Sequence, residues 1–258
     1  MCRLAAYLGP DLLLHKLLEE NPNSLVKQSW ASEELQGTTL NADGFGFGWH
    51  LPDGQATTYT SILPIWSDTN LSGLAQTLHS KLWLAYVRSA TPGQATNQAN
   101  TQPFKHGKFL FQHNGRIEKF NDGPRAALHR HLSAEISSEI EANTDSEYLF
   151  ALCKQYLLDG KSALEALGLA CQDLATLLAD TPALLNMIIS DGDAIFACRH
   201  AINGGQCPSL YYTNTHPHYP DAVVIASERF SMEEHWHEVA KHSLLKVNSR
   251  GEIETKSL

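Results

Sequence analysis

The stretch Met1-Cys2-Arg3-Leu4-Ala5-Ala6-Tyr7-Leu8-Gly9 opens the chain and decides how the other motifs are interpreted. Its centre, Leu4 to Leu8, is apolar and predicts a buried strand. A small residue after the initiator methionine normally allows removal of Met1, which would leave Cys2 as the first residue. Cys2 would then carry a nucleophilic thiol and a basic α-amine together. The simpler interpretation is a small apolar residue that begins a strand, so the remaining chain has to decide.

Composition limits the classes of protein to consider. The chain has 258 residues with 43% hydrophobic content, enough for a single domain over residues 1–258 with a sizeable core. Acidic residues outnumber basic ones by 28 to 19, the formal net charge is -9, and neither sign forms a long run. Nucleic-acid binders and anionic-membrane binders need clustered Lys and Arg. We therefore expect neither nucleic acid nor a membrane as partner.

The cysteines and histidines do not predict a bound metal. The five cysteines are odd in number and widely spaced, without a C-x-x-C pair, which argues against a disulfide framework and a zinc ribbon. Three His-x-His pairs, at 129–131, 216–218 and 235–237, lack further ligands at suitable spacing. We expect no metal and no cofactor. The cysteine usage and the lack of a long apolar segment predict a cytoplasmic protein.

The order of predicted elements indicates an α+β fold. Helices are predicted at 12–18, 144–158 and 162–178. Strands are predicted at 41–49, 81–88, 109–113, 185–190, 194–198, 210–213 and 223–226, with a last hairpin around 248–251. Thr144 and Glu147 match a capping box before the second helix. Asn114-Gly115 is a strong turn dipeptide and is predicted to end the strand at 109–113.

Five segments, taken in order, resemble the class II glutamine amidotransferase domain, which belongs to the N-terminal nucleophile hydrolases. They are Cys2, Asp43-Gly44-Phe45-Gly46, Arg88-Ser89-Ala90-Thr91, His113-Asn114-Gly115 and Thr144-Asp145-Ser146-Glu147. The segments 97–104, 189–192 and 226–228 look more like the stand-alone branch of that family. This branch includes the γ-glutamyl hydrolase of ergothioneine biosynthesis and a yeast glutathione-degrading subunit. The resemblance implies a four-layer αββα sandwich with two mainly antiparallel sheets between layers of helices.

The resemblance also implies a role for each matching residue. Cys2 would attack the γ-amide carbon of a glutamyl substrate and form a thioester. The Asn114 side chain and the Gly115 N–H match the donors of the oxyanion hole. Arg88 matches the residue that binds the substrate α-carboxylate, a task suited to a planar bidentate donor. Asp145 matches the residue that binds the α-amine.

Further residues are assigned to the same pocket or to its surroundings. Ser89, Thr91 and His113 are predicted to lie at the substrate. Since His113 ends a predicted strand, its side chain should point away from its neighbour Asn114, and a structural role is preferred to that of a general base. Glu228 and Trp236 resemble family positions whose role we take to be packing.

The implied reaction is hydrolysis of a γ-glutamyl amide, with glutamine as the default substrate giving glutamate and ammonia. Biosynthetic members carry a synthase domain that consumes the ammonia, whereas this chain stops at Leu258. We therefore expect either a separate ammonia acceptor or partner subunit, or a plain hydrolase. Two alternatives stay open. One is a hydrolase of a γ-glutamyl conjugate, such as a glutathione-like compound or an ergothioneine-pathway intermediate. The other is a non-catalytic glutamine-binding module.

Overall fold

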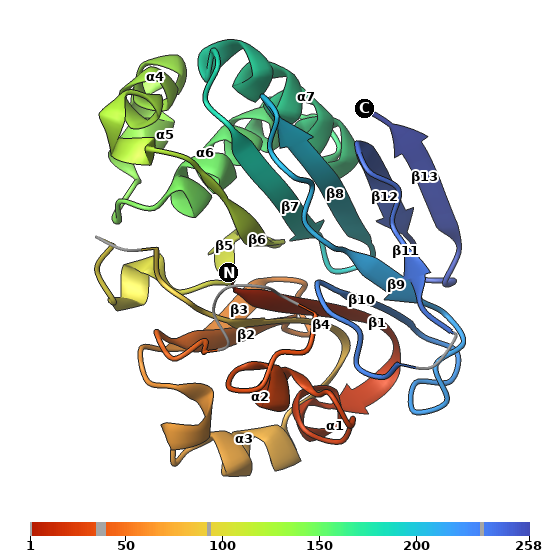
Figure 1. Cartoon of the computed structure of the whole chain (residues 1–258). Helices are drawn as coiled ribbons and strands as arrows, with labels where there is room; N and C mark the ends of the chain where they lie inside the picture. Colours follow the sequence, from red (N-terminus) through yellow and green to blue (C-terminus); the bar gives the residue numbers. More distant parts are fainter. Residues whose placement is uncertain (1, 35–39, 92–93, 233–234) are drawn as a thin grey trace.

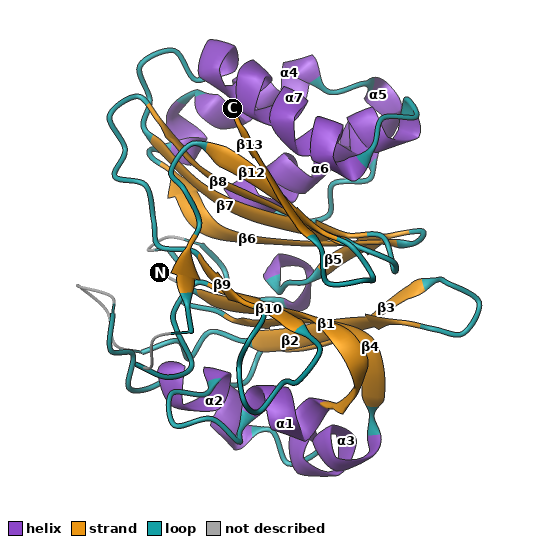
Figure 2. Cartoon of the chain, turned by 90° about the vertical axis from the view of Figure 1, so that its right-hand side faces the viewer, coloured by secondary structure: helices purple, strands orange, loops and turns teal. Residues whose placement is uncertain are grey.

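Two antiparallel sheets face each other, and helices cover the outer face of each sheet (Figure 1). The computed structural model describes residues 2–34, 40–91, 94–232 and 235–258. In the view turned by 90°, the layers follow one another as helices, sheet, sheet and helices (Figure 2). The predicted four-layer αββα sandwich is confirmed.

The first sheet holds the N-terminal strand between two neighbours. Its strand order is β11 (His237–Glu238), β9 (Tyr211–Thr213), β10 (Val223–Ala226), β1 (Arg3–Leu13), β4 (His79–Val87), β2 (Phe45–His50) and β3 (Ala56–Ser61). Strand β1 pairs antiparallel with β10 on one side and with β4 on the other. The residue that precedes β1 therefore lies beside the end of β4, where Arg88 follows.

The second sheet contains the strands from the middle and the end of the chain. Its order is β13 (Ile253–Ser257), β12 (Ser243–Val247), β8 (Ile195–Ile202), β7 (Ala183–Ser190), β6 (Phe109–Ile117) and β5 (Phe104–His106). Strands β6 and β7 pair over eight residues of each strand, from Leu110 opposite Ser190 to Ile117 opposite Ala183.

The helices form the two outer layers. They are α1 (Leu14–Leu18), α2 (Leu25–Gln28) and α3 (Leu71–Thr77) on the first sheet, and α4 (Pro124–His131), α5 (Ala134–Ser138), α6 (Asp145–Leu158) and α7 (Ala163–Leu177) on the second. Short 3-10 turns are Ile65–Ser67, Gln98–Asn100 and Phe120–Asp122. Buried apolar residues form three clusters, which correspond to the three interfaces between the four layers. Alternation along β1 divides its residues between two of them, with Leu4 in the middle cluster and Ala5 in the outer one.

The predicted helices at 144–158 and 162–178 are confirmed as α6 and α7. Their caps differ from the prediction. The Thr144 hydroxyl accepts the Glu147 N–H at 3.3 Å, but the Glu147 carboxylate accepts N–H groups of residues 141 and 142 instead of completing a box. The complete capping box belongs to α7, where Ser162 and Glu165 bond reciprocally.

The prediction of a helix over 12–18 is wrong at its start. Strand β1 continues to Leu13, because Leu12 and Leu13 pair with the first residues of β4 after an irregularity between Leu8 and Leu12. Pro10 lies within that irregularity, where its missing N–H costs no ladder hydrogen bond. The helix is limited to Leu14–Leu18.

The prediction of a turn at Asn114-Gly115 is also wrong. Strand β6 continues to Ile117, and Asn114 and Gly115 lie opposite Asn186 and Leu185 of β7. The long pairing with β7 overrides the local turn preference of the dipeptide. The glycine is needed here for space, since a Cβ on Gly115 would lie 1.8 Å from the Leu184 carbonyl oxygen.

Candidate active site

Cys2 lies directly before β1, beside the segment that follows β4. The Ser89 N–H donates to the Cys2 sulfur at 3.3 Å, and the thiol faces the Ser89 carbonyl oxygen at 3.4 Å. Cys2 is partly exposed. Ser89 thus contacts the predicted nucleophile through its main chain. Met1 lies outside the described residues, so its removal stays a prediction.

Arg3 and Glu228 hold the backbone of Cys2 from behind. The Arg3 Nε donates to Glu228 Oε2 at 2.8 Å, and both side chains are fully buried. The Arg3 Nη1 donates to the Cys2 carbonyl oxygen at 2.8 Å. Arg3 also bonds the Ser32 hydroxyl, which itself donates to Glu228. The orientation of Cys2 is therefore fixed by the side chain of the next residue.

Glu228 is the acceptor at the centre of this network. Its Oε1 accepts the Glu33 N–H at 2.7 Å and the Asn23 amide at 3.1 Å. Burial alone would raise the pKa of Glu228, but these donors together with Arg3 and Ser32 lower the pKa below its usual value. The carboxylate is consequently ionised at neutral pH. The interpretation of Glu228 as a packing residue missed this role, because nothing local in the sequence links residues 3 and 228.

Tyr86 connects Cys2 with the second sheet. Its hydroxyl lies within hydrogen-bonding reach of the Cys2 thiol and donates to the His113 carbonyl oxygen at 3.0 Å. Gln102 donates to the same hydroxyl at 3.0 Å. The Tyr86 phenol therefore lies between the Cys2 thiol and the backbone of His113, the residue before Asn114. The sequence interpretation did not name Tyr86 or Gln102, although Gln102 belongs to the 97–104 segment.

The free edge of β6 presents a row of N–H groups near this point. The His113 N–H bonds the Gln102 side chain at 2.5 Å, and the Ile117 N–H bonds Asp145 Oδ2 at 2.7 Å. Since N–H directions alternate along a strand, the Gly115 N–H points to the same edge, between these two. The Asn114 side chain is buried, and its Oδ1 has no hydrogen-bond partner among the described residues.

Arg88 is buried and shapes the loop after β4. Its guanidinium donates to the Asp43 carbonyl oxygen at 3.3 Å and to the Ala95 carbonyl oxygen at 3.2 Å. The Asp43 carboxylate accepts the Ala90 N–H at 2.8 Å. These contacts hold Ala90 and Ala95 close to Asp43, just before the start of β2. The predicted substrate ligand is thus already part of a structural network.

A cavity of about 420 Å³ brings Thr91 and Asp145 together. Its lining also includes Gln94 and residues 116–122. Asp145 also joins the end of β6 to the start of α6, because Oδ1 accepts the Ser146 N–H at 2.9 Å. The cavity therefore has a carboxylate beside the free edge of β6.

His113 points away from these residues. Its Nδ1 bonds the Ser146 hydroxyl at 2.9 Å and its Nε2 bonds the Leu184 carbonyl oxygen at 3.0 Å. Burial lowers the pKa of His113, and Asp145 opposes this only in part. The structure does not bring the imidazole to Cys2. It holds the start of α6 against β6 and β7.

A second cavity of about 630 Å³ adjoins the first through shared residues. Arg116 and Glu118 line both cavities. The second cavity extends to Ser209, whose hydroxyl donates to the Ser227 carbonyl oxygen at 2.8 Å. The Ser227 hydroxyl accepts the Leu4 N–H at 3.0 Å, next to the Arg3 network. The site thus offers space on two sides of the β6 edge.

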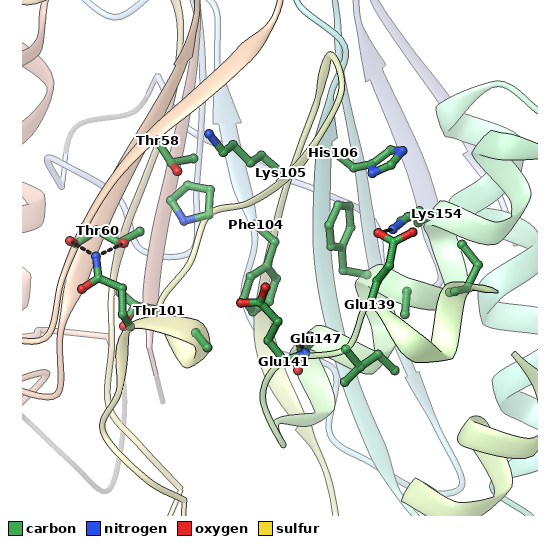
Figure 3. A pocket seen from close by; sticks show the side chains of 17 residues that line it. Thr58, Thr60, Thr101, Phe104, Lys105, His106, Glu139, Glu141, Glu147 and Lys154 are labelled. Carbon is green, nitrogen blue, oxygen red and sulfur yellow. Dashed lines mark hydrogen bonds and ion pairs between the residues drawn. The ribbon is translucent and has the colours of Figure 1, made fainter. Parts of the chain in front are cut away.

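A further cavity of about 640 Å³ lies at the β3 and β5 edge (Figure 3). Gln98 is bonded there to the Thr60 carbonyl and hydroxyl oxygens, and Lys154 pairs with Glu139. None of the predicted site residues lines this cavity.

Two properties of the described residues limit the possible classes of site. No helix among them is both long and apolar enough to cross a membrane. Within the same residues, no group of three or more His, Cys, Asp or Glu side chains is arranged to hold a metal ion.

The sandwich with a cysteine at the start of a central strand has the architecture of the N-terminal nucleophile hydrolases. A family model described as glutamine amidotransferases class-II matches residues 17–220. The chain belongs to this family.

The curated relatives cover almost the whole chain. The gamma-glutamyl-hercynylcysteine sulfoxide hydrolase of Mycolicibacterium smegmatis is 30% identical over 247 residues, which cover 96% of both chains. The protein of the same name from Mycobacterium tuberculosis is 31% identical and covers 97% of this chain and 94% of its own. A probable glutamine amidotransferase of Saccharomyces cerevisiae is 27% identical over 97% of this chain and 82% of its own.

Solved structures show the same fold. A glutamine aminotransferase class-II domain protein from Silicibacter pomeroyi superposes with a TM-score of 0.73 at 23% identity, over 99% of this chain and 98% of its own. The glutamine phosphoribosylpyrophosphate amidotransferase of B. subtilis superposes with a TM-score of 0.64 at 17% identity, and 49% of that chain is covered.

Proposed function

We propose that this protein hydrolyses γ-glutamyl amides through a thioester on Cys2. The observation that carries the proposal is the Tyr86 contact, because one phenol touches both the Cys2 thiol and the backbone that leads into Asn114 and Gly115. This contact supports a shared site for the nucleophile and the two proposed oxyanion donors. The family membership supports an amidohydrolase.

The proposed reaction starts with transfer of the thiol proton to the α-amine of Cys2, once Met1 is removed. The sulfur then attacks the γ-carbonyl carbon, and the Asn114 amide and the Gly115 N–H donate to the resulting oxyanion. The amine returns the proton to the leaving nitrogen, and the C–N bond breaks to give the thioester. Water then attacks the thioester and releases glutamate and the thiol.

The glutamate head group is proposed to occupy the 420 Å³ cavity. Arg88 would bind its α-carboxylate and Asp145 its α-amine. Thr91 and Ser89 would form the wall between them. Since Asp145 already accepts two N–H groups, it is held in place before the substrate arrives.

A γ-glutamyl conjugate is favoured over glutamine as the physiological substrate. Glutamine releases only ammonia, whereas the 630 Å³ cavity beyond Arg116 has room for a much larger leaving group. The curated relatives named as γ-glutamyl conjugate hydrolases agree with this choice. Glutamine would be a minimal substrate. A separate ammonia acceptor would then be unnecessary.

The test compares Cys2→Ala with the unchanged protein. Intact mass first shows whether Met1 is absent. Glutamate release is then measured from glutamine, glutathione and γ-glutamylglycine, and binding of each compound is measured by calorimetry. We expect Cys2→Ala to bind but not to hydrolyse. Full activity of Cys2→Ala contradicts the mechanism, and binding without any hydrolysis by the processed unchanged protein favours a non-catalytic binding module.

A further inference from the structure

Strand pairing places Tyr86 beside the nucleophile. Leu4 of β1 lies opposite Tyr86 of β4, and both side chains belong to the middle apolar cluster between the sheets. Because side chains alternate along a strand, Cys2 lies on the same face as Leu4. Cys2 is then the diagonal neighbour of Tyr86, within reach of a long side chain. Cys2 packs against the middle apolar cluster, which agrees with a position on the same face as Leu4 and Tyr86.

The Tyr86 hydroxyl has more partners than one proton can serve. A phenol has one O–H to donate and an oxygen that accepts. The proton is directed to the His113 carbonyl oxygen at 3.0 Å, and Gln102 donates to the phenol oxygen at 3.0 Å. The Cys2 thiol is the remaining partner. As long as the thiol keeps its proton, Cys2 can donate either to the phenol oxygen or to the Ser89 carbonyl oxygen at 3.4 Å, and the phenol contacts are satisfied.

Loss of the thiol proton changes this arrangement, since a thiolate faces the phenol oxygen without a hydrogen between them. We propose that Tyr86 then turns its O–H from the His113 carbonyl to the Cys2 sulfur and stabilises the thiolate by a charge-assisted hydrogen bond. When the sulfur attacks the γ-carbonyl carbon it loses its negative charge, and the O–H returns to His113. Tyr86 keeps its proton throughout.

Gln102 makes this movement possible at little cost. Its amide nitrogen donates to the His113 carbonyl oxygen at 3.2 Å as well as to the phenol. The His113 carbonyl therefore keeps a donor when the Tyr86 hydroxyl turns away, which avoids an unpaired buried acceptor. Burial also raises the pKa of Tyr86 well above its usual value, so the phenol stays protonated at neutral pH.

The experiment follows alkylation of Cys2 by iodoacetamide as a function of pH in the unchanged protein, in Tyr86→Phe and in Tyr59→Phe. The modified N-terminal peptide is quantified by mass spectrometry. We expect the midpoint of the Cys2 profile to rise by about one pH unit in Tyr86→Phe, as expected for the loss of a hydrogen bond to a charged group. Tyr59 bonds Asp68 on another part of the sheet, and its variant should not move the midpoint.

Cys207 serves as an internal control, because it is also partly exposed and reports any general loosening of the fold. Its profile should be the same in all three proteins. An unchanged Cys2 midpoint in a folded Tyr86→Phe protein overturns the proposal. If Tyr86→Phe does not fold, Gln102→Met provides the test. This variant keeps the phenol but removes the amide that donates to the Tyr86 hydroxyl and to the His113 carbonyl oxygen. A Cys2 midpoint that does not change in this variant again contradicts the proposal.

This inference rests on Cys2 as the proposed nucleophile, but its readout does not need turnover. If the unchanged protein releases no glutamate while the midpoint still rises in Tyr86→Phe, the proposed function fails and the Tyr86 contact stands. If glutamate is released and the midpoint does not move, the proposed function stands and the role of Tyr86 fails.

Discussion

Two buried polar regions, one on each sheet, differ in the group at their centre, which is a carboxylate in the first and a pair of neutral amides in the second. Each carboxylate oxygen of Glu228 accepts two hydrogen bonds, from Arg3 and Ser32 on one side and from Asn23 and the Glu33 N–H on the other. On the facing sheet, the Oδ1 atoms of the cross-strand pair Asn114 and Asn186 are buried without partners among the described residues. The Glu228 carboxylate is therefore fully paired and holds a backbone, although the Oδ1 of its partner Asn23 lacks a hydrogen bond among the described residues, whereas both asparagine side chains of the facing sheet are incompletely paired.

The largest loss of stability should follow from removing the carboxylate at the centre of the Glu228 network. Glu228→Ala removes the fully buried carboxylate from the Arg3–Glu228 pair, and loss of one partner of a buried ion pair typically costs about 3–5 kcal/mol. Urea unfolding measures the change. Glu254→Ala is the matched control, because its pair with Lys246 is largely exposed and should contribute less than about 1 kcal/mol. Equal losses in the two variants would show that the buried pair contributes no more to stability than the exposed one.

On the facing sheet, substitution of Asn114 should affect turnover more than stability. We expect Asn114→Ala to lower kcat by about 10² to 10³, as for the loss of one oxyanion donor. Asn186→Ala loses its 2.6 Å bond to the Ser209 carbonyl oxygen and should be destabilised more, with a smaller loss of kcat. Glutamate release and thermal unfolding of both variants test this. A larger loss of kcat in Asn186→Ala would exchange the two roles.

Acidification should reduce the contribution of the Glu228 network to stability. The pKa of Glu228 is lowered in the folded protein by hydrogen bonds and Arg3, against the effect of burial. Its contribution to stability is present above its unfolded value of about 4.3 and is lost as the pH falls through the lower folded value. The melting temperature of Glu228→Gln should therefore fall less steeply than that of the unchanged protein on acidification below this value. Parallel curves would show that other groups dominate acid unfolding.

The smallest effect concerns the second cavity. Lys241 is exposed on its lining and can attract a carboxylate on the leaving group. We expect Lys241→Met to reduce kcat/KM for γ-glutamylglycine about threefold but to leave γ-glutamylethylamide unchanged, since an exposed charge pair contributes about 0.2–1 kcal/mol. Lys81→Met is the control, because Lys81 is exposed at the start of β4. An equal reduction for both substrates would mean that Lys241 does not recognise the carboxylate.

Local sequence patterns predicted the elements whose stability is local. The helices at 144–158 and 162–178 have strong apolar patterns and N-caps, and the structure confirms them as α6 and α7. The predictions at 12–18 and 114–115 were wrong because pairing with distant strands decided the backbone. The family resemblance indicated the sandwich itself, which no periodicity could have supplied.

The candidate site shows the same division. The quoted motifs named Cys2 and Asn114, which the structure connects through Tyr86 and the His113 backbone. The sequence did not reveal the partners that hold them, because Arg3 and Glu228 are 225 positions apart. Tyr86 carried a weak signal in hindsight, since it lies two residues before Arg88 on the same predicted strand.

The Gln102 side chain has a consequence for protein engineering. The segment 97–104 is an attractive place to exchange loops when substrate preference is to be altered, because it begins with the exposed residues Asn97 and Gln98, although residues 100–103 are buried. A grafted loop without Gln102 would also release the Tyr86 hydroxyl and the His113 backbone. Libraries at this segment should therefore keep position 102 fixed, so that a change in selectivity is not confused with a damaged nucleophile.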